Sequence, residues 1–426
     1  MVSLRHSSLF FFCMITVSFT WGLWLRETTG LQMAMVLLTL YLVAVCILIS
    51  LNSITHNVIL YFIVLSLLAG ILCLAFTTEN ILVFYICFEA TLIPMFLMVL
   101  GWGARSQKMR AAFYLFFFTL ISSLMMLLSL VKLYALTGSL HLGELRGLEL
   151  PYFYQKWMFL SFVLAFGVKI PLFPFHIWLP QAHVEAPLAG SVLLAGILLK
   201  LGGYGIIAIA YGLYPLCFSY YSSLLQWTAL IGVLYGGLTT IRQSDAKRLI
   251  AYSSVAHMGF AVYALFGGSL ELGFMAAFLI MIAHGFVSPA LFITAGVIYE
   301  RYGTRVIKYY KGLSIIMPLA NTLAFLFTLC SIAFPGSLNF VGEFYVFLVA
   351  AQENLLHCCM LSLGAILGLV YSLYFYMRLF TGSFSPYLIK GRDLNTLEVQ
   401  ALVLLFVPCL LMGLYPIWFL TSPLLS

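Results

Sequence analysis

Long runs of apolar residues follow one another along nearly the whole chain, and this feature decides which architectures are open to it. Hydrophobic residues make up 64% of the 426 positions, whereas Asp, Glu, Lys and Arg together make up 8%. A soluble domain usually carries about 25% charged residues, so the sequence excludes a water-soluble architecture. Runs such as 34–51 show no apolar–polar alternation, which excludes a transmembrane β-barrel. We expect an all-α polytopic membrane protein.

Reading apolar runs between polar breaks predicts about 13 transmembrane helices. The expected ranges are 8–25, 32–51, 57–77, 80–101, 111–136, 157–181, 188–210, 222–240, 249–267, 272–299, 313–350, 357–380 and 398–420. The run from Leu9 lacks a small-residue cleavage site, so it is expected to be the first helix rather than a signal peptide. It also lacks the Arg- and Ser-rich pattern of a transit peptide.

The basic residues supply an independent check on this helix count. With these helices, 14 of the 20 basic residues fall in loops on the side of the N-terminus, three on the opposite side and three within helices. Those on the N-terminal side are Arg5, Arg105, Lys108, Arg110, Arg242, Lys247, Arg248, Arg301, Arg305, Lys308, Lys311, Arg378, Lys390 and Arg392. If a helix in mid-chain had been missed, the basic residues would be distributed over both sides of the membrane. The N-terminus is therefore expected on the basic side and the C-terminus opposite.

Two of the apolar segments do not read as simple spans. Segment 166–180 contains three prolines, each of which removes a backbone donor and clashes with the preceding turn. Segment 313–350 would be roughly 57 Å long at about 1.5 Å per residue, well beyond a hydrocarbon core of about 30 Å. Residues 333–337 (Ala-Phe-Pro-Gly-Ser) offer a breaking point in it.

The two interrupted helices are five helices apart, so they cross the membrane in opposite directions. Such pairs are typical of inverted repeats with functional sites at the breaks. We expect one repeat at helices 3–7 (57–210) and a second at helices 8–12 (211–381). Residues 1–56 would form N-terminal helices, and 382–426 a C-terminal helix.

Ionisable side chains near the middle of predicted helices are the candidate functional residues. A charge at the bilayer centre costs at least about 2.5–3.5 kcal/mol, and such residues usually face the bundle interior and mark ion or proton paths. The five are Glu89, Lys169, Lys200, His284 and Glu343. The alternative is that they are buried ion pairs that only fix helix packing, which suits one pair better than five scattered groups.

The chemistry of these groups suits protons better than metal ions or organic substrates. A lysine in apolar surroundings loses its hydration, and a nearby carboxylate restores its preference for the charged form. Movement of Glu89 toward or away from Lys169 would therefore load or release a proton. Na⁺ prefers several carboxylate and carbonyl oxygens to lysines. Possible accessory residues are His176, His183, Lys247 and His257.

Other chemistries find little support in the residues. The chain has nine cysteines without C-x-x-C spacing, so neither a metal site nor an iron–sulfur cluster is expected. The histidines lack the facing-helix repetition of haem ligands, and no P-loop motif occurs. Residues 203–208 match the start of a dinucleotide fingerprint, but they lie in a predicted span without a βαβ unit. We expect no cofactor on this chain and no nucleic-acid partner.

The segment 167–187 (GVKIPLFPFHIWLPQAHVEAP), continued by 198–205 (LLKLGGYG), closely resembles the antiporter-like proton-translocating subunits of respiratory complex I. Supporting motifs are FEATLIPM at 88–95, the stretch 244–259, and AHG at 283–285. The resemblance covers about residues 57–420. Among the family's three large paralogues, one carries glutamate in the second broken helix where the others carry lysine, and this chain has that glutamate at position 343.

The resemblance implies a role for each buried charge: a Glu89–Lys169 pair, a central Lys200, a connecting His284 and a terminal Glu343. It implies proton translocation driven by NADH oxidation and ubiquinone reduction on other subunits, which would hold the FMN and iron–sulfur clusters. The implied partners are membrane lipids and other membrane-arm subunits, including the antiporter-like chains 2 and 5.

One departure from the family's pattern concerns the N-terminus. The family's glutamate normally lies on the fifth helix of 14, whereas Glu89 lies on the fourth predicted helix. We therefore expect one N-terminal helix fewer than usual, which agrees with an N-terminus on the basic side. Small size and the missing presequence favour the mitochondrial inner membrane, with the basic face toward the matrix, over a bacterial plasma membrane.

Two further functions remain open at the level of sequence. A subunit of a multisubunit sodium/proton antiporter would resemble this family throughout its core. A purely structural membrane scaffold would use the buried charges for packing alone.

Overall fold

The computed structural model of the chain describes residues 30–148, 150–388 and 391–416, and all named elements in these ranges are helices. The predicted helix 8–25 lies outside them. The α-helices of the first half are α2 (Gly30–Ser53), α3 (Val58–Thr77), α4 (Ile81–Ala90), α5 (Leu92–Trp102), α6 (Lys108–Thr137), α7 (Leu142–Leu145), α8 (Tyr152–Lys169), α9 (Trp178–Glu185), α10 (Leu188–Leu193) and α11 (Leu199–Gly205). Two π-helical segments, η1 (Leu194–Leu198) and η2 (Ile206–Tyr211), flank α11.

The second half continues the same pattern of long helices. These are α12 (Pro215–Ile241), α13 (Ala246–Leu265), α14 (Leu270–Tyr302), α15 (Pro318–Ser331), α16 (Leu338–Glu353), α17 (Leu355–Phe380) and α18 (Thr396–Leu414), with the 3₁₀ turns η3 (Ile307–Tyr309) and η4 (Leu313–Ile315). Within the described ranges, nine helices are long and apolar enough to cross a membrane. An all-helical membrane architecture is thus confirmed. The predicted span 80–101 is divided at Thr91 into α4 and α5.

Both predicted helix interruptions are present. The first separates α8 from α9 over residues 170–177, where Pro171 and Pro174 have no N–H to donate. The Trp178 indole donates to Val168 O at 2.9 Å and ties the start of α9 to the end of α8. This interruption leaves Lys169 as the last residue of a helix rather than a residue within one.

The second interruption separates α15 from α16 at the predicted residues. Ala333 and Gly336 adopt left-handed backbone conformations with φ of 61° and 95°, which turns the chain between the two helices. The Ser337 hydroxyl then accepts a hydrogen bond from Phe340 N and caps α16. The predicted interrupted helix 313–350 therefore consists of two shorter helices, α15 and α16, preceded by the turn η4.

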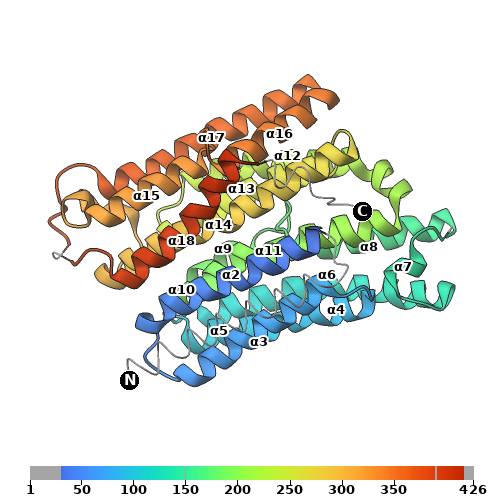
Figure 1. Ribbon diagram of the computed structural model, residues 1–426, viewed down its shortest axis with the longest axis horizontal. Helices are drawn as coiled ribbons and strands as arrows, with labels where there is room; N and C mark the ends of the chain where they lie inside the picture. Colours follow the sequence, from blue (N-terminus) through green and yellow to red (C-terminus); the bar gives the residue numbers. More distant parts are fainter. Residues whose placement is uncertain (1–29, 149, 389–390, 417–426) are drawn as a thin grey trace.

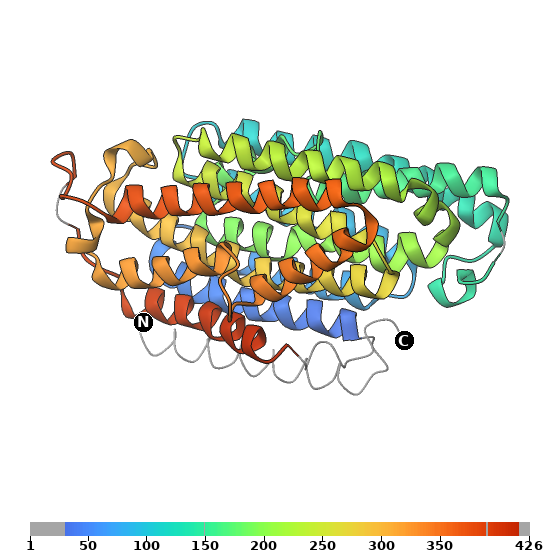
Figure 2. The same ribbon diagram turned by 90° about the horizontal axis from the view of Figure 1, so that it is seen from above.

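The helices form an elongated bundle with the central elements enclosed by the others. Figure 1 shows α3 to α6 along one side and α12, α15, α16 and α17 along the other, with α10, α11 and α14 between them. In α14 the apolar window is fully buried, and in 188–211 it is 94% buried. Figure 2 shows α18 beside α2, and the Tyr41 hydroxyl on α2 donates to Leu404 O on α18. Lys200 on α11 and His284 on α14 are consequently in the interior.

The close packing of α18 on the second interruption gives a prediction for stability. A Cβ at Gly413 would lie 2.7 Å from Leu338 N, among backbone atoms that cannot rotate away. Gly413→Ala should therefore lower the free energy of unfolding by about 1–3 kcal/mol. Gly70→Ala is the control, because open space surrounds that position on α3. Thermal unfolding of the detergent-purified protein checks this, and equal melting temperatures for both variants would contradict it.

Candidate functional site

The five predicted charges lie on five different elements around the bundle centre. Glu89 is near the end of α4, Lys169 ends α8, and Lys200 is on α11 between the two π segments. His284 is near the middle of α14, and Glu343 follows the start of α16 by about one and a half turns. π-Helical segments are rare and are frequently found at functional sites.

Lys169 is buried and is held where α4 meets α5. Its ammonium donates to Phe88 O at 3.3 Å and to Thr91 Oγ1 at 3.2 Å, and it lies 4.1 Å from the centroid of the Phe88 ring. The division of the helix at Thr91 is therefore what offers acceptors to this lysine. Neither acceptor carries a charge.

Glu89 is not in direct contact with Lys169. Among the described residues, the ion pairs do not include these two, and neither Glu89 carboxylate oxygen has a hydrogen-bond partner. The Ser123 hydroxyl on α6 is nearby but donates to Leu120 O at 2.8 Å. The lysine instead bonds to the residues on both sides of Glu89, so a change of side-chain rotamer would be needed to close the pair.

Lys200 and His284 form the most direct contact between two predicted residues. The Lys200 ammonium lies 2.7 Å from His284 Nδ1 and donates to Ala195 O at 2.5 Å. Both side chains are buried, at 0% and 4% exposure. Nε2, the other ring nitrogen of His284, is buried without a hydrogen-bond partner, which leaves it free to receive or give a proton.

His257, predicted as an accessory residue, joins His284 to Glu343. Its ring centroid is 6.1 Å from that of His284, and its Nδ1 is 3.7 Å from Glu343 Oε1. The Tyr371 hydroxyl on α17 lies 3.3 Å from His257 Nε2. The structure therefore brings Lys200, His284, His257 and Glu343 into one series, with Tyr371 at its side.

The other accessory residues lie nearer the basic loops. His183 is fully buried, with its ring stacked on Phe292 at 4.4 Å. Lys247 is buried and donates to Ala186 O at 3.2 Å. His176 lies apart from these in the first interruption, against the rings of Tyr235 and Tyr252.

Several residues around the site were missed by the sequence prediction. Arg305 is buried and donates to Val184 O next to Glu185, which is also buried. Tyr371 reads in sequence as an ordinary aromatic residue of a span, and nothing in the spacing reveals its contact with His257. Thr91 could have been found, because it directly follows Glu89-Ala90 in the FEATLIPM motif.

In the described part of the chain, no group of three or more His, Cys, Asp or Glu side chains could hold a metal ion. What the arrangement offers is a line of groups that can each exchange a proton. Lysine, histidine and glutamate all do so in proteins.

The chain resembles one known protein family over most of its length. Residues 78–368 match the family model described as NADH:quinone oxidoreductase/Mrp antiporter, transmembrane. NADH-ubiquinone oxidoreductase chain 4 of Metridium senile is 44% identical over 400 residues, which are 94% of this chain and 81% of that protein. The Arabidopsis thaliana chain 4 is 40% identical, with 92% of this chain and 79% of that protein covered.

Two solved structures resemble the fold over nearly the whole chain. A chain of respiratory complex I from Thermus thermophilus with bound NADH superposes with a TM-score of 0.86 at 31% identity, covering 92% of this chain and 83% of that one. A chain of the Mrp complex from Dietzia sp. DQ12-45-1b also has a TM-score of 0.86, at 17% identity, covering 99% and 91%. The latter likeness shows the fold alone.

The contact between Lys169 and Thr91 gives a second prediction for stability. Thr91→Val keeps the side-chain shape but removes an acceptor from a buried ammonium, so we expect a loss of about 1–3 kcal/mol. Thr119→Val is the matched control, because that buried hydroxyl donates only within its own helix, to Leu115 O at 2.6 Å and Phe116 O at 3.2 Å. Thermal unfolding of the purified protein measures both. An effect no larger for Thr91→Val than for the control would show that Thr91 does not hold Lys169.

Proposed function

The chain belongs to the NADH:quinone oxidoreductase/Mrp antiporter family, and its relatives are chain 4 subunits of NADH-ubiquinone oxidoreductase. From this membership we propose that its buried Lys, His and Glu side chains form a proton relay. The chain is a membrane subunit of a proton-translocating NADH:ubiquinone oxidoreductase, complex I. The observation that carries the relay is the series from Lys200 through His284 and His257 to Glu343 inside the bundle.

The transfer from Lys200 to His284 follows from their geometry. The Lys200 nitrogen lies 2.7 Å from Nδ1 of His284, so an ammonium N–H bond can break as a new N–H bond forms at Nδ1. The ring then releases the proton on Nε2 and returns to a neutral tautomer. Lys200 is left neutral, which removes the cost of a buried charge without a counter-ion.

The transfer onward from His284 crosses a wider gap. Ring centroids 6.1 Å apart suit one bridging water better than a direct hydrogen bond. His257 then faces the Glu343 carboxylate at 3.7 Å through Nδ1. Glu343 is the proposed terminal holder of the proton before its release to the face opposite the basic loops.

Glu89 and Lys169 are proposed as the switch that controls proton loading in the first half. Lys169 has only neutral acceptors at present, and Glu89 has no donor. Approach of the carboxylate would stabilise the ammonium, and its withdrawal would favour proton loss. The interruption next to Lys169 supplies the freedom for such a movement. His176, His183 and Lys247 are proposed as accessory residues on the uptake side.

Two inverted repeats, 57–210 and 211–381, are proposed as the framework of the relay. Matched backbone bonds support them: Ile81 N donates to Leu140 O and Leu142 N to Glu79 O, whereas Ala246 N donates to Arg305 O and Ile307 N to Ser244 O. Each of the four residues in the second pair of bonds follows the corresponding residue of the first pair by the same number of positions.

The helix ends of the two halves match in the same register. Asn80 caps α4 and Asp245 caps α13, while Gly138 and Gly303 end α6 and α14 with φ of 74° and 70°. Asp245 follows Asn80, and Gly303 follows Gly138, by the same number of residues that separates the two sets of backbone bonds. With residues 1–56 and 382–426 outside the repeats, this arrangement accounts for the proposed total of about 13 helices.

The location and partners are proposed from the relatives and from the charge pattern. The relatives include animal and plant chain 4 proteins, which supports the mitochondrial inner membrane. The basic loops would face the matrix, together with the N-terminus, since basic loops stay on the side of synthesis. Antiporter-like chains 2 and 5 are proposed as membrane-arm neighbours. NADH, FMN, iron–sulfur clusters and ubiquinone would be bound by other subunits.

A subunit of a sodium/proton antiporter is supported less well. The likeness to the Mrp complex is 17% identical and concerns the fold, whereas the chain 4 relatives are 38–44% identical. A purely structural scaffold is tested by the variants below.

Lys200→Met tests the central step. Methionine preserves length and helix propensity but cannot carry a proton, so we expect an assembled complex with strongly reduced NADH-driven proton pumping. Lys132→Met is the control, since Lys132 is near a helix end over the Tyr154 ring. Proton release per NADH in proteoliposomes, with assembly checked on native gels, measures the effect. Full pumping in Lys200→Met would eliminate this residue from the relay.

Glu343 variants separate a proton carrier from a side chain that only packs. Glu343→Gln keeps shape and hydrogen bonding but cannot titrate, so Gln and Ala should both reduce coupled turnover at least about tenfold. Glu343→Lys should keep partial function, because lysine can also carry the proton. The exposed Glu271 provides the control substitution Glu271→Gln. If Glu343 only packs, Glu343→Gln should leave proton pumping unchanged and Glu343→Ala should reduce it. NADH-driven acidification measured in these variants distinguishes the two roles.

A further inference from the structure

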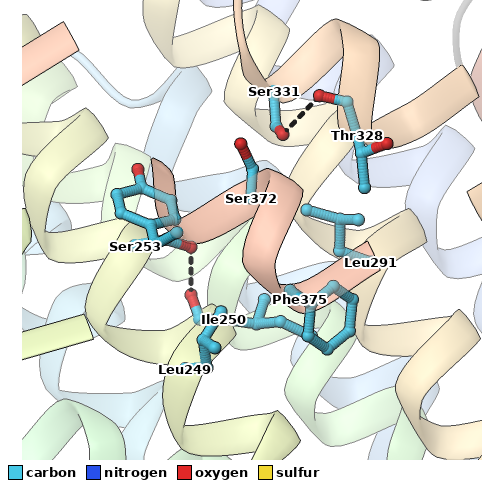
Figure 3. Close-up of a pocket in the computed structure, with 9 residues that line it drawn as sticks. Leu249, Ile250, Ser253, Leu291, Thr328, Ser331, Ser372 and Phe375 are labelled. Carbon is cyan, nitrogen blue, oxygen red and sulfur yellow. Dashed lines mark hydrogen bonds between the residues drawn. The ribbon is translucent and has the colours of Figure 1, made fainter. Parts of the chain in front are cut away.

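Many buried hydroxyl groups in the second half of the bundle are bonded within their own helices. The walls of a small, largely apolar cavity between α13, α14, α15 and α17 show the pattern. Ser253 donates to Ile250 O at 2.7 Å, and Ser331 donates to Thr328 O at 2.8 Å, as Figure 3 shows. A hydroxyl that donates to its own helix leaves no donor unmet, so these groups call for no further partner.

Two buried atoms beside the relay differ from these hydroxyls. Among the described residues, Nε2 of His284 on α14 and Oδ1 of Asn339 on α16 are buried without a hydrogen-bond partner. The two side chains are 4% and 6% exposed. A buried donor or acceptor without a partner is rare in folded proteins and calls for an explanation.

The two atoms have complementary hydrogen-bonding capacities. Nδ1 of His284 lies 2.7 Å from the Lys200 ammonium, which can only donate. Nδ1 therefore accepts, and the proton of the neutral ring is on Nε2. The amide oxygen of Asn339 can only accept. The unpaired donor of one side chain thus suits the unpaired acceptor of the other.

The helices that carry them are antiparallel and closely packed. Glu353, the last residue of α16, accepts a hydrogen bond from Gly268 N at 2.6 Å, just before α14 begins. Farther along, a Cβ at Gly342 would lie 3.1 Å from Ile280 N, so α16 lies directly against the backbone of α14 there. Gly342 and Ile280 are therefore at the same depth in the bundle.

This register places Asn339 beside His284. Asn339 is three residues before Gly342 on α16, and both are on the buried side of that helix. Three residues beyond Ile280 on α14 lies Ala283, which directly precedes His284. Because both helices rise about 1.5 Å per residue, the asparagine is level with these two residues.

The His284 ring is also on the side of α14 that faces α16. His257 shows this, because its ring centroid is 6.1 Å from that of His284 while its Nδ1 is 3.7 Å from Glu343 Oε1 on α16. Glu343 follows Asn339 by four residues and so shares its face of the helix. The asparagine therefore lies at the point where α16 comes nearest to the central histidine.

We propose that Asn339 is a positioning residue of the relay, whose amide oxygen accepts a hydrogen bond from Nε2–H of His284 after rotation of the asparagine side chain. The inference rests on the proposed relay and adds the group that orients its central histidine. The bond made by one ring nitrogen sets which nitrogen carries the proton, so Asn339 keeps Nδ1 open to the proton of Lys200. The hydrogen bond opens when the Nε2 proton moves on, and the amide itself neither gains nor loses a proton.

Asn339→Leu tests this role, because leucine has a similar shape but no hydrogen-bonding group. We expect NADH-driven proton pumping of the assembled complex to fall at least about threefold, since a wrongly oriented histidine slows the transfer. Asn339→Asp keeps an acceptor oxygen in the same place and should retain more pumping than Asn339→Leu. If Asn339 only packs, the order should reverse, because a buried apolar side chain is tolerated better than an unpaired carboxylate.

The matched control substitutions are Asn321→Leu and Asn321→Asp. Asn321 is on α15, before the same interruption, and its amide oxygen already accepts a hydrogen bond from the Tyr376 hydroxyl at 2.8 Å. Pumping per assembled complex should be unchanged in both controls, with assembly checked on native gels. Should Asn339→Leu fail to assemble, Asn339→Ala removes the amide without adding apolar volume.

Three results would overturn the positioning role. They are wild-type pumping in Asn339→Leu, less pumping in Asn339→Asp than in Asn339→Leu, and an equal loss in Asn321→Leu. In each case, a loss of pumping in Glu343→Gln would leave the relay in place. Unchanged pumping in Glu343→Gln would overturn the relay itself.

Discussion

In the hydrocarbon core every backbone N–H and C=O group needs a partner within the protein, so a helix can be interrupted there only where the freed groups find other partners. Both interruptions of this bundle supply such partners from their own turns, although Phe175 and Phe334 are exposed on the bundle surface. At the first, Leu172 N donates to Gly167 O at 2.8 Å; at the second, Phe334 N donates to Leu329 O at 3.1 Å. The two breaks end α8 at Lys169 and begin α16 shortly before Glu343. The rest of the site is arranged between these two points.

The enclosed centre explains why ionisable groups can persist in so apolar a chain. Lys200 and His284 lie on the two most buried stretches and satisfy one another at 2.7 Å. Lys169 is bonded only to neutral oxygens. A fixed charge in such a place costs several kcal/mol, whereas a group that exchanges its proton with a neighbour avoids holding the charge. The same feature that makes these residues unfavourable for stability thus suits them to moving protons.

Much of this arrangement could be predicted from the sequence, because the length of an apolar run, the position of a proline and an ionisable residue within an apolar run are all local signals. The interruptions within 166–180 and at 333–337 are predicted from the three prolines of the first segment and the Pro335-Gly336 pair of the second, although Pro180 lies inside α9 rather than in the break. The contact of Lys200 with His284 could not be predicted from spacing, since it depends on how α11 packs against α14. Tyr371 and Asn339 were missed for the same reason: tyrosine and asparagine in a span carry no charge to mark them. The direct Glu89–Lys169 contact expected from the family is not formed in this structure, and their pairing stays a prediction.

The proposed relay depends above all on Glu343, which must take up and release a proton while the complex works. Infrared difference spectroscopy of the assembled complex, recorded as NADH is oxidised, detects the C=O stretch of a carboxylic acid that forms or disappears. We expect a carboxylic-acid band in the wild-type difference spectrum that is absent in Glu343→Gln and unaffected in Glu271→Gln. A band of equal size in Glu343→Gln and the wild type, or none in either, would contradict it.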